Sequence, residues 1–250
     1  MTAARHPLAD AHPLADIDLA IFDKDGTLIE FHLMWTDWVG ELADRMAGAA
    51  AGRRFDGLLH EVMGLDAGSG RVLPHGALAA TPMARLREAV VDAVAGAGLA
   101  PAEAERIVRS AWHAPDPVVL ARPVADLGAL FGGLRDAGIR IAVATSDDRE
   151  PTERTLAYLS VAHLVEALAC ADDGRPVKPH PAPVQWICRA LGVPPTRTAV
   201  IGDSPADLAM GRAAGAGLVV GVLTGVGDRA TLAPLADRVI DSVADLAPGP

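Results

Sequence analysis

The chain has 250 residues and a formal net charge of −10, with 22 basic side chains against 32 acidic ones. A chain of this length buries roughly 70–75% of its unfolded surface, so it needs no disulfide or metal to hold a core. The acidic balance argues against nucleic acid or an anionic membrane as the main partner, and no apolar run approaches the ~18 residues of a membrane-spanning helix.

The N-terminal stretch contains the pentapeptide His-Pro-Leu-Ala-Asp twice, from residue 6 and from residue 12. Two copies are too few for a repeat fold, and His-Pro pairs beside a terminus are typical of a flexible arm, which we expect over residues 1–16. No basic segment followed by an apolar core is present, so we expect no signal peptide and a cytoplasmic protein. In that compartment Cys170 and Cys188 are expected to be reduced thiols.

The stretch Ile17–Leu28 runs from an apolar segment directly into two carboxylates and a glycine. The apolar segment predicts a strand that is buried on both faces of a parallel sheet. Asp23 and Asp25 follow it two positions apart, and Gly26 ends the extended run. Because ligands of open α/β sheets bind outside the carboxyl ends of the strands, the two acids are candidates for a nucleophile, an acid–base catalyst or metal ligands. Taken alone, the pair also fits a solvated turn.

Residues 31–116 show helical spacing of apolar residues and no strand signal. The glycine-rich segment 66–76 is expected to be a loop. Four helices are predicted. We expect them to start at Thr36, Phe55, Thr81 and Ala100, each of which is either the N-cap or the first residue of its helix. We therefore expect a helical cap domain inserted after the first strand.

Helices and strands alternate from Pro123 onward, which predicts βαβ units and a parallel sheet with helices on both faces. The fold class is thus α/β, with a Rossmann-like core formed by residues 17–30 and 117–250. Right-handed crossovers bring the ends of such strands to one edge of the sheet. The later strands are expected at 139–145, 165–170, 198–202 and 218–222, with 238–240 as a candidate edge strand.

Polar residues follow two of these later strands. Thr145–Asp147 comes after one strand, and Asp203 comes after another, with Asp207 four residues further on; Lys178 lies between them in the chain. Taken alone, each of these residues has a purely structural explanation: a strand-end hydroxyl, a helix cap, a first-turn acid or a solvated lysine. Their occurrence at successive strand ends favours a single site.

These motifs together resemble those of the haloacid dehalogenase superfamily of phosphohydrolases. The matching segments, in order, are Asp23-Lys-Asp25-Gly-Thr27, Thr145, Lys178-Pro179 and Gly202-Asp203-Ser-Pro-Ala-Asp207. The spacing is that of the branch with a helical cap after the first motif, which includes phosphoglycolate phosphatases. The dehalogenases of this superfamily lack the second aspartate, so its presence favours phosphate chemistry.

The resemblance implies a role for each core residue. Asp23 would be the nucleophile that forms an aspartyl-phosphate, and Asp25 the general acid and base. Lys178 would supply a fixed positive charge against the phosphoryl group. Thr145 and Ser146 would bind the phosphate oxygens.

The resemblance also implies Mg²⁺, held by Asp23, the backbone carbonyl of Asp25, and Asp203, with Asp207 as a ligand through water or as a residue that orients a water. Electrostatics points the same way, since two like charges about 4 Å apart repel by ~4 kcal/mol at an effective dielectric of ~20. A phosphate dianion among these acids would meet several such repulsions, which a divalent cation offsets.

We therefore expect a Mg²⁺-dependent phosphatase of a small phosphorylated metabolite, acting as a monomer or homodimer without nucleic-acid or membrane partners. A sugar phosphomutase of the same fold and a catalytically silent binding module are the alternatives. His32, Arg71 and His75 are candidates for leaving-group specificity, although surface residues of a helical domain would have the same pattern. Asp172 and Asp173 are expected to be solvated.

Overall fold

The computed structural model describes residues 12–66, 68–73, 76–81, 83–113, 116, 118 and 120–248. The chain divides into two compact units, one made of Met1–Phe31 with Pro117–Pro250 and the other of His32–Asp116. Within the described residues, no helix is both long enough and apolar enough to cross a bilayer.

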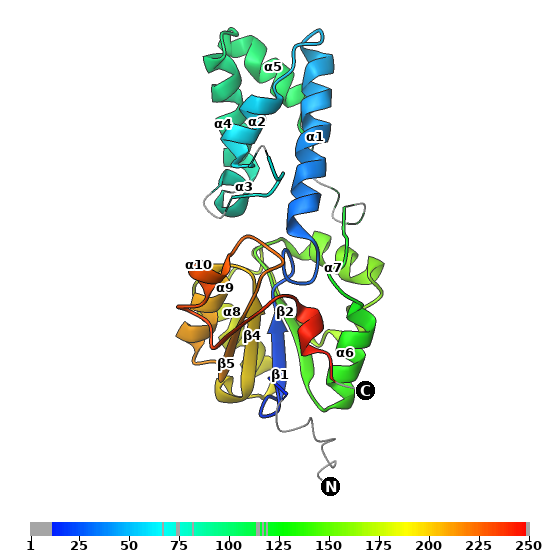
Figure 1. Cartoon of the computed structure of the whole chain (residues 1–250). Coiled ribbons are helices and arrows are strands. Elements are labelled where there is room, and N and C mark those ends of the chain that lie inside the picture. The colour runs from blue at the N-terminus through cyan, green and yellow to red at the C-terminus, as the bar shows by residue number, and fades with distance from the viewer. Residues whose placement is uncertain are drawn as a thin grey trace. The chain divides into compact units, whose positions relative to one another are not determined.

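The first unit is built, over its described residues, on a six-stranded parallel sheet in the order β3-β2-β1-β4-β5-β6. Figure 1 shows β1 between β2 and β4. Strands β2 and β3 lie on one side of β1, and strands β4 to β6 lie on the other. The strand order therefore reverses beside β1. All strands predicted from the sequence are confirmed; they are β1 (Leu19–Phe22), β2 (Arg140–Ala144), β3 (Ala167–Ala169), β4 (Thr198–Gly202), β5 (Leu218–Val222) and β6 (Arg238–Ile240).

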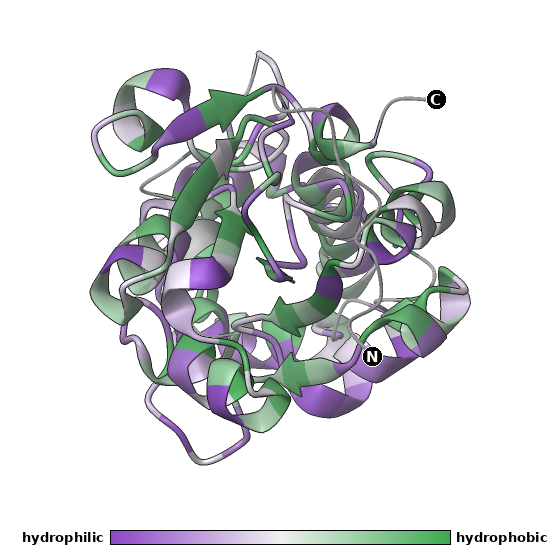
Figure 2. Cartoon of the chain, turned by 90° about the horizontal axis from the view of Figure 1, so that it is seen from below, coloured by the Kyte–Doolittle hydropathy of each residue, from purple (hydrophilic) through white to green (hydrophobic). Residues whose placement is uncertain are grey.

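Helices cover both faces of this sheet, as the alternation predicted. Successive strand residues point to opposite faces, so Ala20 and Phe22 pack in one core cluster, while Leu19 and Ile21 pack in another. Figure 2 shows strands that are mostly apolar, with helices that carry both polar and apolar residues. The first cluster lies against α6 (Leu127–Asp136) and α7 (Arg149–Tyr158), and the second against α8 (Ala182–Leu191) and α9 (Pro205–Ala214). The short helix α10 (Arg229–Leu232) packs beside α9.

The second unit is helical, and its described residues contain no strand. Its helices are α1 (Phe31–Ala49), α2 (Asp56–Met63), α3 (Ala77–Ala80), α4 (Met83–Gly96) and α5 (Pro101–Ala111). The predicted start of the first helix at Thr36 is wrong, because α1 begins at Phe31. Thr36 lies inside the helix, where its hydroxyl donates to the carbonyl of Gly70 at 2.6 Å rather than capping the helix. The short helix α3 was not predicted; it begins directly after the segment 66–76, which was expected to be a loop.

Residues 12–16, expected as part of a flexible arm, form a turn that is packed on the first unit. Leu14 is fully buried in the core cluster that contains Phe22. The His12 ring accepts a hydrogen bond at Nδ1 from the Leu14 amide and contacts the Leu246 carbonyl through Nε2. The first pentapeptide copy, including His6, lies outside the described residues. The two cysteines are buried and unbridged, in line with the expected thiols.

Candidate active site

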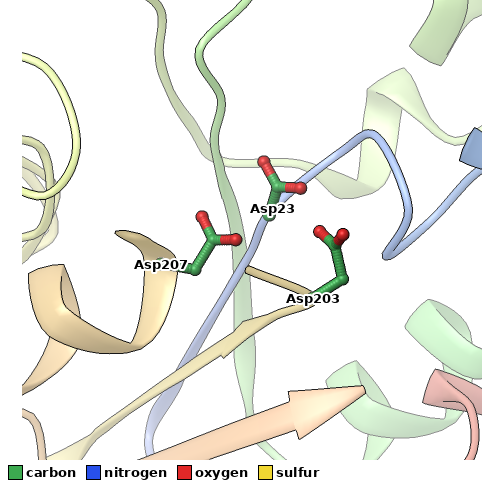
Figure 3. Close-up of side chains that lie close together, drawn as sticks. All are labelled: Asp23, Asp203 and Asp207. Atoms are coloured by element: carbon green, nitrogen blue, oxygen red, sulfur yellow. The ribbon is translucent and has the colours of Figure 1, made fainter. Parts of the chain in front are cut away.

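Three buried aspartates meet at the carboxyl ends of β1 and β4. Asp23 directly follows β1, Asp203 directly follows β4, and Asp207 lies in the first turn of α9. One carboxylate oxygen from each lies within 4.8 Å of the others, and Figure 3 shows the three carboxylates facing one another. The register explains the meeting: the Asp23 amide donates to the Ile201 carbonyl at 2.8 Å, which keeps the two strand ends level.

Lys178 supplies a buried positive charge to this cluster. Its ammonium nitrogen lies 2.5 Å from Asp23 Oδ1 and 2.6 Å from Asp207 Oδ1, and its side chain is only 5% exposed. The structure therefore brings together four of the residues that the sequence assigned to one site.

Hydrogen bonds fix the orientation of the two aspartates that follow β4. Asp203 Oδ2 accepts from the Val226 amide at 2.7 Å, and its Oδ1 accepts from the Thr27 hydroxyl at 3.4 Å. Asp207 Oδ2 accepts from both the amide and the hydroxyl of Ser204 in a capping box, which leaves its Oδ1 toward Lys178. Thr27, which the motif contributes after Asp25, is thus linked across the sheet to Asp203.

Asp25 lies beside a second buried lysine. Lys24 is 1% exposed, and its ammonium nitrogen lies 2.6 Å from Asp25 Oδ1 and 3.0 Å from Asp147 Oδ2. Thr145 is buried at the end of β2 and accepts from the Asp147 amide at 3.1 Å, whereas Ser146 is exposed. Sequence reasoning missed Lys24, although a lysine between two acids directly after an apolar strand was a usable signal.

The three candidates for leaving-group specificity belong to the helical insert. His32 Nδ1 accepts from the Val72 amide at 3.1 Å, and the Arg71 carbonyl accepts from the Asp66 amide at 2.9 Å. Both contacts shape the segment around residue 70. His75 lies outside the described residues. A role in specificity therefore stays a prediction for His32, Arg71 and His75.

The expectation that Asp173 is solvated is wrong. Its carboxylate, about 9% exposed, accepts from Arg149 at 2.7 Å, from Arg175 at 2.7 Å and from the Cys170 amide at 2.9 Å. These partners lower the pKa of Asp173 despite the opposing effect of burial. The network ties the loop after β3 to the start of α7. Asp172 also contributes, by accepting from the Arg149 amide at 3.0 Å.

The three clustered acids are short of positive charge. Burial raises the pKa of Asp23 to about 7, and Asp207 and Asp25 act in the same direction against Lys178. Burial likewise raises the pKa of Asp203 well above its usual range, with added repulsion from Asp23 and Asp207. Burial disfavours the Lys178 ammonium, but Asp207 and Asp23 more than offset this and raise its pKa, so it stays charged.

An oxygen-binding divalent cation fits this arrangement. All three converging donors are carboxylate oxygens, which suit Mg²⁺ better than a soft transition metal. Glycines shape the surroundings: a Cβ on Gly225 would lie 1.9 Å from Asp203 Oδ2, and one on Gly26 would lie 2.6 Å from the same oxygen. The backbone approaches Asp203 so closely that no side chain fits at these two positions.

We expect Gly225→Ala to weaken Mg²⁺ binding about 10- to 100-fold, because the new methyl group forces the Asp203 carboxylate out of the cluster. Isothermal titration calorimetry with Mg²⁺ measures the loss. The matched control is Gly132→Ala, where a Cβ meets nothing within 4 Å inside α6, and it should leave binding unchanged. Equal affinities in both variants would mean that Asp203 does not bind the metal.

The comparison with family models places most of the chain in one family. The model described as haloacid dehalogenase-like hydrolase matches residues 17–215, which includes β1, the helical insert, and all strands up to β4 with α9. The match spans every aspartate and lysine of the site.

Two curated relatives and one solved structure illustrate the similarity. The phosphoglycolate phosphatase of Rhodospirillum rubrum is 36% identical over 110 residues, which is 44% of this chain and 46% of that protein. The pyrophosphatase PpaX of Bacillus mycoides is 30% identical over 46% of this chain and 54% of that protein. The matches thus span about half the length of these relatives. A hydrolase structure from Deinococcus radiodurans, with bound phosphate and sodium, has a TM-score of 0.65 at 22% identity and covers 93% of this chain and 94% of its own. It shows the shared fold.

Proposed function

Since the chain belongs to the haloacid dehalogenase-like hydrolase family, we propose that it is a Mg²⁺-dependent phosphatase acting on a small phosphorylated metabolite through an aspartyl-phosphate. The observation that carries the proposal is the convergence of Asp23, Asp203, Asp207 and Lys178 at the carboxyl ends of β1 and β4.

Asp23, Asp203 and Asp207 would hold Mg²⁺, together with the backbone carbonyl of Asp25 suggested by the family resemblance. The cation would supply the positive charge that a phosphate dianion needs when it approaches several carboxylates. The raised pKa values of Asp23 and Asp203 support this assignment, since they mark a cluster with too few cations of its own.

Asp23 would attack the phosphorus through a carboxylate oxygen. The bond between phosphorus and the ester oxygen breaks, Asp25 donates a proton to that oxygen, and the alcohol leaves. In the second half, Asp25 accepts a proton from a water that attacks the phosphorus, and phosphate and the free Asp23 carboxylate are released. Burial raises the pKa of Asp25, although the charge of Lys24 acts to lower it. The raised pKa favours the protonated acid that the first half of the reaction requires.

Lys178 would stay bound to Asp23 and present its charge to the phosphoryl oxygens. The Thr145 hydroxyl, at the end of β2, would donate to one of these oxygens, with Ser146 beside it. The helical insert would serve as a cap that reads the leaving group, with His32, Arg71 and His75 as its candidate contacts.

The relatives' names support a class of substrate rather than one compound. One relative is named for phosphoglycolate and another for pyrophosphate, so their leaving groups differ while the transferred group is the same. We therefore propose that the core binds the phosphoryl group and that the helical insert selects the metabolite.

A panel of phosphate esters with and without Mg²⁺ tests the proposal. We expect phosphate release from at least one small metabolite, dependent on Mg²⁺ and abolished by EDTA. Conversion of a hexose 1-phosphate to the 6-phosphate without phosphate release would instead identify a phosphomutase. Tight binding of a metabolite without any turnover would identify a silent binding module.

A further inference from the structure

The chain holds two lysines, Lys24 and Lys178, against twenty arginines. Both lysines are buried, and each ammonium bridges two carboxylates near the carboxyl edge of the sheet. Every other permanent side-chain cation of this chain is therefore an arginine. A lysine differs from an arginine in presenting a compact point charge on a flexible stem. Lys178 has a role in the proposed function, but Lys24 has none so far.

The two lysines serve different pairs of acids. Lys178 lies between Asp23 and Asp207, within the proposed metal cluster. Lys24 lies between Asp25 and Asp147, outside that cluster. Lys24 is 1% exposed, so its ammonium is tolerated there only because Asp25 and Asp147 pair with it. A buried ion pair as a whole adds little net stability compared with apolar side chains of similar volume. The stability of the fold alone therefore gives little reason for this group of charges.

Geometry supplies another reason. The ammonium occupies Asp25 Oδ1 at 2.6 Å, so the other oxygen of this carboxylate is left for proton exchange. Asp147 Oδ2 also pairs with the ammonium, at 3.0 Å, and the Asp147 amide donates to the Thr145 hydroxyl at the end of β2. The backbone around Lys24 is also fixed, because its carbonyl accepts from the Leu28 amide at 2.8 Å.

We propose that Lys24 is a positioning residue, whose ammonium, anchored by Asp147, holds the Asp25 carboxylate in one orientation at the end of β1. The inference rests on the proposed function, since the orientation of Asp25 matters only if this carboxyl group exchanges the proton. Lys24 does not touch substrate and acts through Asp25.

Lys24→Met keeps an unbranched side chain only one atom shorter and removes the ammonium. Its kcat/KM reports the formation of the aspartyl-phosphate, in which Asp25 protonates the leaving oxygen. For an alkyl phosphate, which needs that proton, we expect a loss of about 10- to 100-fold, a part of the ~10²–10⁴ that acid–base catalysis contributes. For p-nitrophenyl phosphate, whose leaving group departs without a proton, we expect a loss below about threefold.

Two further variants keep the test decisive. Lys24→Arg, which restores a cation, should recover part of the lost activity on the alkyl phosphate. Asp147→Asn, which leaves the lysine but weakens its anchor, should show a smaller loss with the same dependence on the leaving group. A general loss of folding would instead lower kcat/KM equally for both substrates in all variants. Equal losses on the two substrates would overturn the inference.

A spectroscopic measurement on ¹⁵N-lysine-labelled protein tests the contact without activity. With two lysines in the chain, Lys24→Met assigns the two Nζ signals. We expect the Lys24 signal to shift in Asp25→Asn and in Asp147→Asn but not in Asp136→Asn, an exposed acid at the end of α6. An unshifted Lys24 signal in Asp25→Asn would overturn the inference. If the wild-type protein hydrolysed no phosphoester, the proposed function would fail, and these spectra would still decide whether Lys24 holds Asp25.

Discussion

Asp23→Asn is expected to abolish phosphate release, with a loss of about 10⁴-fold or more in kcat, as for the removal of other enzymatic nucleophiles. The amide has the shape of the carboxylate but cannot attack phosphorus. It also loses the charge that pairs with Lys178 at 2.5 Å. Steady-state phosphate release with the best substrate of the panel measures the loss.

The control for this variant is Asp136→Asn, which makes the same chemical change at an exposed site and should keep full activity. The Asp23 variant should remain folded, since burial already raises the pKa of this group to about 7 and a neutral side chain suits the site. Activity within tenfold of the wild type in a folded Asp23→Asn protein would place the nucleophile elsewhere.

Removal of Mg²⁺ is expected to have the second largest effect, eliminating activity and making stability depend on pH. The pKa of Asp23 is about 7 in the folded protein against 3.8 as the ordinary value, so the folded state binds more protons between these limits. The full free-energy cost of burying the Asp23 charge applies above about pH 7, and this cost declines as the pH falls toward 4. In EDTA, the melting temperature should therefore rise when the pH is lowered from 8 to 6.

Mg²⁺ should reverse this trend, because it stabilises the ionised acids and competes with protons. At a concentration 100 times the Kd, a bound ligand adds about 2.7 kcal/mol, which corresponds to roughly 5–10 °C in melting temperature for a chain of this size. The gain should be larger at pH 8 than at pH 6. Thermal melts at both pH values, with EDTA and with Mg²⁺, provide the measurement. A gain that is equal at both values, or absent, would contradict a metal held by these aspartates.

The sheet and the convergence of its acids were predictable from the sequence for a local reason. The run before Asp23 is apolar at every core position, and such runs occur in strands buried on both faces. Once the strands are parallel, with right-handed connections, their carboxyl ends share one edge of the sheet. Asp23 and Asp203 then meet because β1 and β4 are neighbours, a pairing that the structure supplies.

The features that were not predicted depend on partners distant in the chain. Asp173 has the sequence context of a solvated loop acid, and only the fold brings Arg149 to it from 24 residues away. Lys24 pairs with Asp147 across two strands. Thr36 has the composition of a helix cap, but its hydroxyl finds the Gly70 carbonyl instead.

The central claim is that a phosphoryl group is transferred to the Asp23 carboxylate, and trapping that group tests it most directly. Wild-type protein mixed with its best substrate is quenched in acid during turnover, treated with borohydride and analysed by peptide mass spectrometry. We predict the mass of one phosphoryl group on the peptide that contains Asp23 before reduction and homoserine at position 23 after it. A phosphoryl group found on another residue, or on none while phosphate is being released, would contradict the account.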